Sequence, residues 1–257
     1  MNTKTIGFLA ATTLAAITSA PSALGFAVNI ERGSFQVNPG GEFVAIETQG
    51  FVNNYAAVAK QTVGFPNPTS PTQVTGFSTF CLERSESLNY TDNYSGSLNM
   101  TVMNGGTDNT DPGPGDPLSK GTAWLYSLFA TGSLNGYNYG TNPYSNSEIE
   151  ARKDSAEALQ KAIWYLEDEN AGDTNTGNNA FLAAAVTHFG TIASAKSAAD
   201  TSFGVSAINM VLASDPNARR QDVLVYLGTP VPDAGATLGM FGAGLIGVGM
   251  LRRRWVA

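Results

Sequence analysis

Two side chains in this sequence have types that could do chemistry together, a cysteine and a glutamine. Cys81 is the only cysteine of the chain and stands in the segment Thr79–Glu83. A single cysteine cannot form an internal disulfide, even in an oxidising compartment. Its thiol is therefore buried and inert, used in an intermolecular disulfide, or consumed by another bond.

The glutamine lies in a stretch with the periodicity of an amphipathic helix. Apolar residues recur there at i, i+3, i+4 and i+7, at Leu159, Ala162, Ile163 and Leu166. At about 100° per residue, Gln160 falls on the border of this apolar stripe. A carboxamide at that border is partly removed from water and needs a hydrogen-bonding partner. We predict that this partner is Cys81.

These two segments resemble the thioester domains of bacterial surface adhesins. Three short pieces carry the resemblance: Phe80-Cys81, Leu159-Gln160 and Ile163-Trp164. In those domains the cysteine sulfur is joined to the side-chain carbonyl of the glutamine with loss of ammonia. The resemblance implies a thioester between Cys81 and Gln160.

A thioester is activated toward amines because thiolate is a good leaving group. Attack by an amine at the Gln160 carbonyl would leave an amide bond to the partner and would free Cys81. We predict that Phe80, Trp164 and Tyr165 shield such a bond from water. Since the reaction happens once per molecule, we expect a reactive surface protein and not a turnover enzyme.

Other catalytic chemistry has little support in the sequence. The chain has one histidine, and it has neither a nucleophile-elbow motif nor clustered metal ligands, which argues against a hydrolase. We expect no cofactor and no bound metal.

Length and composition indicate a single acidic body. At 257 residues with 42% hydrophobic content, the chain can bury one good core. Its formal net charge is −7, and loss of Lys4 and the cluster Arg252–Arg254 with the two ends would make it more negative. This charge argues against nucleic-acid binding, which requires cations that neutralise phosphates.

Residues 1–25 have the pattern of a secretory signal peptide. Lys4 supplies the positive charge, and Ile6–Ile17 forms an apolar run that is short for a membrane span. The small residues of Ala23–Gly25 make an acceptable cleavage site. We therefore expect an exported chain.

The C-terminal tail is the most specific signal. The motif Val231-Pro232-Asp233-Ala234-Gly235 precedes an apolar run at 236–251 and then Arg252–Arg254. It resembles the PEP-CTERM class of sorting signals, in the variant that reads Val-Pro-Asp-Ser-Gly, with Ala234 in place of serine.

That resemblance implies a Gram-negative bacterium that makes exopolysaccharide. It also implies a membrane exosortase that recognises Val231–Gly235 and processes the tail. Until then the run 236–251 would hold the chain in the inner membrane, with the basic residues on the cytoplasmic side. The body would finally lie at the cell surface or in the extracellular matrix. An ordinary single-pass anchor is the alternative.

We divide the chain into a signal peptide (1–25), a thioester-domain-like body (26–229) and a sorting tail (230–257). For the body we expect an α+β fold, in which an antiparallel β body carries an inserted helical segment and the last strands return to the first sheet. Strands are predicted at 43–47, 55–59, 73–82, 97–103, 205–212 and 222–227. Helices are predicted at 119–131, from a capping box at Ser147 to about 169, at 179–189 and at 192–199.

A second function remains open, that of a non-covalent, exopolysaccharide-associated or structural surface protein without a thioester. The aromatic loop 134–144 carries Tyr137, Tyr139 and Tyr144. Such rings could stack on sugars, or they could cover the core.

Overall fold

The computed structural model describes residues 25–37, 41–65, 72–103, 115–140, 145–169 and 178–228. Within these residues the main layer is an antiparallel sheet of seven strands in the order β3-β4-β2-β1-β5-β8-β9. Its strands are β1 (Phe26–Glu31), β2 (Phe43–Glu47), β3 (Lys60–Phe65), β4 (Thr72–Thr79), β5 (Tyr94–Asn99), β8 (Val205–Leu212) and β9 (Asp215–Tyr226). A small second sheet pairs β6 (Thr101–Val102) with β7 (Asp116–Pro117).

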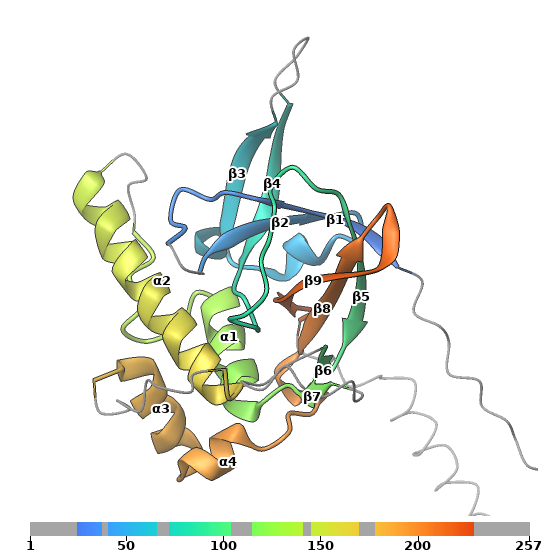
Figure 1. The fold of residues 1–257 in the computed structure, drawn as a ribbon. Coiled ribbons are helices and arrows are strands. Elements are labelled where there is room, and N and C mark those ends of the chain that lie inside the picture. Colours follow the sequence, from blue (N-terminus) through green and yellow to red (C-terminus); the bar gives the residue numbers. More distant parts are fainter. Residues whose placement is uncertain are drawn as a thin grey trace, which may run out of the picture.

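The helices follow one another between β7 and β8, so they form an insertion into the sheet. They are α1 (Lys120–Ala130), α2 (Asn146–Leu166), α3 (Ala180–Phe189) and α4 (Ile192–Lys196). Figure 1 shows them gathered on one side of the sheet. The predicted antiparallel body with inserted helices is confirmed, and β8 returns to the sheet beside β5 as expected.

The sheet curls because the chain leaves β4 and then pairs with the far edge strand, β9. Cys81 forms an antiparallel bridge with Val223. The Leu82 N–H donates to the Asp222 carbonyl at 3.0 Å, and the Leu224 N–H donates to the Phe80 carbonyl at 3.3 Å. The cysteine therefore stands at the seam where the two ends of the sheet meet.

The strand predicted at 55–59 is wrong. The chain forms two short 3₁₀ helices there, η1 (Phe51–Asn54) and η2 (Ala57–Ala59). Tyr55 and Ala59 are buried, whereas Ala57 and Val58 between them are exposed. The alternation of a strand would bury Ala57 on the same face as Tyr55 and Ala59, so the burial pattern does not fit a strand. The Tyr55 hydroxyl hydrogen-bonds that of Tyr126 at 2.9 Å inside the core.

Two predicted boundaries also need correction. The long helix begins at Asn146 with Ser145 as its N-cap residue, and the Ser147 hydroxyl pairs with the Ser145 hydroxyl at 3.0 Å instead of capping a backbone N–H. The strand predicted at 222–227 begins earlier, because β9 already starts at Asp215.

The two ends of the chain fall outside the described residues, and so do the predicted leader up to residue 24 and the sorting helix predicted at 236–251. Among the helices that the structure describes, none combines the length and the apolarity needed to cross a membrane.

The start of α3 depends on Asn179. Its Oδ1 accepts hydrogen bonds from the N–H groups of Phe181 and Leu182 at 3.1 and 3.2 Å. Its Nδ2 donates to the Ala158 carbonyl of α2 at 2.7 Å. We expect Asn179→Ala to lower the free energy of unfolding by about 1–2 kcal/mol, through the lost cap and the lost tie to α2. Urea unfolding would measure this, with the exposed Thr187→Ala as a control that changes little.

A buried carboxyl group connects the end of α2 to the start of α1. Glu167 Oε1 accepts from the Ser119 hydroxyl at 2.6 Å and from the Ser119 N–H at 3.2 Å. Burial raises the pKa of Glu167 from 4.5 to about 7, although the Ser119 hydrogen bonds act in the opposite direction. At pH values between 4.5 and about 7, Glu167 therefore keeps a proton in the folded chain that it has released in the unfolded chain.

Stability should therefore fall as the pH rises from about 4.5 to about 7, by on the order of 3 kcal/mol for this group. Glutamine at this position keeps the accepting oxygen and cannot ionise, so Glu167→Gln should remove this part of the decline. The difference between the two stability curves isolates Glu167, since Asp222, whose pKa burial raises to about 7, titrates in both proteins. Parallel curves would contradict the assignment.

Candidate functional site

The structure brings Gln160 and Cys81 together in the interior. Gln160 is 1% exposed and Cys81 is 4% exposed. The Gln160 Oε1 atom accepts from the Cys81 N–H at 3.0 Å, and Nε2 donates to the Cys81 carbonyl at 2.8 Å. The Gln160 side-chain amide on α2 is thus hydrogen-bonded to the backbone of the chain segment at the seam, Phe80–Glu83, which we call the seam segment.

A second backbone donor meets the same glutamine oxygen. The Gly41 N–H donates to Gln160 Oε1 at 2.9 Å. Two N–H groups that point at one carbonyl oxygen form the arrangement of an oxyanion hole. Such a pair polarises the carbonyl and stabilises negative charge on its oxygen when a nucleophile adds to the carbon.

Position 41 requires glycine. Its φ angle is +74°, in the left-handed region that side chains rarely adopt. A Cβ atom there would lie 2.9 Å from Val37 Cγ2 and 3.3 Å from the Ala156 carbonyl oxygen. The bare backbone is what allows the Gly41 N–H to approach the glutamine on α2.

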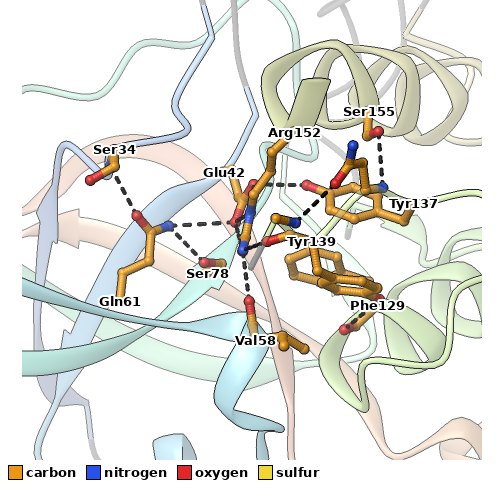
Figure 2. A network of polar contacts seen from close by, with 12 residues as sticks. Ser34, Glu42, Val58, Gln61, Ser78, Phe129, Tyr137, Tyr139, Arg152 and Ser155 are labelled. Atoms are coloured by element: carbon orange, nitrogen blue, oxygen red, sulfur yellow. Dashed lines mark hydrogen bonds and ion pairs between the residues drawn. The ribbon is translucent and has the colours of Figure 1, made fainter. Parts of the chain in front are cut away.

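The residue after this glycine is held by a buried ion pair, which Figure 2 shows at close range. Glu42 and Arg152 are 0% and 3% exposed, and Arg152 Nε donates to both carboxylate oxygens of Glu42 at 3.0 Å. The Tyr137 hydroxyl donates to the same carboxylate at 2.7 Å. Arg152 also donates to the Val58 carbonyl at 2.7 Å. Helix α2 therefore supplies both Gln160 and Arg152, the arginine that holds the Gly41–Glu42 corner in place.

Burial is also the main influence on the cysteine. It raises the pKa of the Cys81 thiol far above its ordinary range, and the negative charge of Glu83 raises it further. The thiol is therefore protonated at neutral pH. Because thiolate is the nucleophilic form, any reaction of this sulfur requires a base close by.

A cavity of about 400 Å³ opens beside the cysteine. Its lining includes Cys81, Glu83, Trp164, Tyr90, Arg32 and Arg84. The Arg32 guanidinium lies 4.9 Å from the centre of the Tyr90 ring. This cavity offers a route from solvent to the seam segment, with both apolar walls and charged groups.

The three predicted shield residues lie in different surroundings. Trp164 is 5% exposed and lines the cavity. Phe80 is fully buried and packs against Phe129, with ring centres 5.0 Å apart. Tyr165 is only partly buried, and the Lys196 ammonium lies 4.3 Å from its ring centre. Only Trp164 of the three borders the route to the cysteine, and the shielding role stays a prediction.

Sequence reasoning missed Gly41, Glu42, Arg152 and Glu83. A signal existed for Arg152, because positions 152, 156 and 160 follow one face of α2 at a spacing of four. A signal also existed for Glu83, since residues two apart in an extended segment share a face. No pattern pointed to the Gly41–Glu42 corner.

The aromatic loop contributes to this network. Tyr137 is buried and bonded to Glu42, and Tyr139 is partly buried with its hydroxyl 3.1 Å from the Phe129 carbonyl. Tyr144 lies outside the described residues. The two tyrosines that the structure describes therefore cover the core. Across the described ranges, no group of three His, Cys, Asp or Glu side chains is placed to hold a metal ion.

Comparison with known proteins bears on the tail. Residues 230–255 match the family model described as the VPDSG-CTERM motif. The chain carries a PEP-CTERM-type sorting signal. This signal is typical of exported proteins that are processed at the membrane. No curated protein and no solved structure shows a significant match to the chain.

Proposed function

We propose that this chain is an exosortase-sorted surface protein whose body forms covalent attachments through a Cys81–Gln160 thioester. The observation that carries the proposal is the contact between the two residues, with both backbone donors on Gln160 Oε1. The only cysteine of the chain and the buried carboxamide of Gln160 are held together in the core, beside a cavity that a partner could enter.

The thioester forms when Cys81 Sγ adds to Gln160 Cδ, the C–N bond breaks, and the nitrogen leaves as ammonia with the proton from the thiol. A primary amine of a surface target then adds to the same carbon. The C–S bond breaks, an amide links the target to Gln160, and the thiol returns. The N–H groups of Gly41 and Cys81 would stabilise the oxyanion in both steps.

A second candidate function has its own supporting observation. Both polar atoms of the Gln160 side chain already have backbone partners, so the residue could act as a structural clasp between α2 and the seam. The body would then be a non-covalent surface or exopolysaccharide-associated protein.

Methylamine distinguishes the two candidates. Incubation of the purified exported chain should place one methylamine on Gln160 and release one titratable thiol at Cys81. The variant Cys81→Ser should take up none. If neither protein is labelled and polysaccharide binding is unaffected by Cys81→Ser, the clasp interpretation is correct.

The sorting part of the proposal has a separate test. An exosortase would recognise Val231–Gly235, and 236–251 would hold the chain in the inner membrane before processing. Deletion of 231–235 should leave the unprocessed chain in the membrane fraction. Equal release of both proteins would mean that the motif is not used.

A further inference from the structure

We propose that Glu83 is the catalytic proton carrier of the Cys81–Gln160 thioester, acting from the cavity beside Cys81. This inference rests on the proposed function and deepens it. It assigns a role to the Glu83 carboxyl oxygen that has no hydrogen-bond partner among the described residues.

Glu83 is placed for this role by the seam segment. The Leu82 N–H donates to the Asp222 carbonyl of β9, which fixes the backbone between Cys81 and Glu83. Both line the same cavity. The electrostatic influence of Glu83 on the thiol also requires that the two groups lie close.

Of the two oxygens of the Glu83 carboxyl group, one accepts a hydrogen bond and the other does not. Glu83 is fully buried, and its Oε2 accepts from the Asp222 N–H at 2.8 Å. Among the residues that the structure describes, its Oε1 has no hydrogen-bond partner. Within the same residues, the indole N–H of Trp164, which also lines the cavity, has none either. Buried polar atoms without partners are rare and costly, so two of them around one cavity indicate that a polar group binds there.

The surroundings of Glu83 favour proton binding. Burial raises its pKa well above the ordinary range, and the charges of Asp222 and Glu86 act in the same direction. This brings the proton affinity of the carboxylate closer to that of the buried thiol, and a proton moves most readily between groups of similar affinity.

Glu83 is a carboxylic acid at rest. When the thioester closes, it gives its proton to the nitrogen that leaves Gln160 as ammonia and takes the proton of Cys81 Sγ in exchange. When the thioester opens, it gives its proton to the departing sulfur and takes a proton from the attacking primary amine. Glu83 ends each step as it began, and no oxidant or reductant is involved.

The test compares Glu83→Gln with Glu150→Gln in the full exported chain. Glu150 is exposed on α2 and is not among the residues that line the cavity, so its substitution is a control for the loss of one negative charge. Two rates are followed by mass spectrometry, namely loss of ammonia after refolding of the reduced chain and capture of methylamine. We expect Glu83→Gln to slow both by about a hundredfold or more, and Glu150→Gln to leave both within a few-fold.

A second variant tests whether the fall in rate comes from altered packing alone. Glu83→Ala opens space beside the sulfur, and added formate should restore part of the rate. Failure of formate to restore it would overturn the inference.

The result for the natural chain separates this inference from the proposed function. If the natural chain shows no ammonia loss, the proposed function fails and Glu83 has no bond to act on. If the natural chain reacts and Glu83→Gln reacts equally fast, the thioester stands and the role of Glu83 is wrong.

Discussion

Replacement of Arg152 by methionine should lower the free energy of unfolding by about 3–5 kcal/mol. The reason is the carboxylate of Glu42, which is fully buried and would lose its only charged partner in the described network. Methionine fills similar space, so the loss reports the uncompensated charge more than a void. Chemical denaturation monitored by tryptophan fluorescence would measure it.

Two further variants make this result specific. Glu42→Gln combined with Arg152→Met removes both charges and should recover at least half of the loss, because no buried charge then stands alone. Lys153→Met lies next to Arg152 on α2 but breaks only the exposed pair with Glu150. It should change stability by about 0.5 kcal/mol or less. Equal losses in all three proteins would contradict the structural role of the pair.

Replacement of Gln160 by leucine should have an effect of similar size. Leucine cannot hydrogen-bond, so the Gly41 N–H, the Cys81 N–H and the Cys81 carbonyl would lose their partner inside the core. At about 1–3 kcal/mol for each unsatisfied buried group, and with partial relaxation, we expect a loss of about 3–6 kcal/mol.

This measurement belongs in a Cys81→Ala background, where no thioester can form and the backbone donors remain. The loss then reports the hydrogen bonds alone. Lys161→Leu is a suitable control, because Lys161 is the next residue on α2 and its ion pair with Glu157 is exposed. A Gln160→Leu effect no larger than that of the control would mean that the clasp contributes nothing to the fold.

The sequence predicted those parts of the molecule that depend on local pattern. The apolar spacing around Leu159 and Ile163 correctly indicated the long helix, and strands were correctly predicted at 43–47 and 205–212. The polar residue on the helix border drew attention to Gln160 because a carboxamide near a core needs a partner.

The parts that it could not predict depend on contacts between distant residues. Tyr55 lies between two short 3₁₀ helices, and its hydroxyl bonds to the Tyr126 hydroxyl and accepts from the N–H of Tyr226, contacts that no local pattern encodes. The Gly41–Glu42 corner exists because Arg152, far along the chain, satisfies Glu42. A pattern can show that a buried charge or amide needs a partner, but only the folded topology shows which one.

The most direct test of the thioester is the intact mass of the exported chain, purified without reducing agents or amines. Denaturation at acid pH exposes Cys81, so its thiol can then be titrated. We predict a mass lower than that of the processed sequence by one ammonia, no titratable thiol, and no such deficit in Cys81→Ala. The full mass together with one titratable thiol per chain would contradict the account.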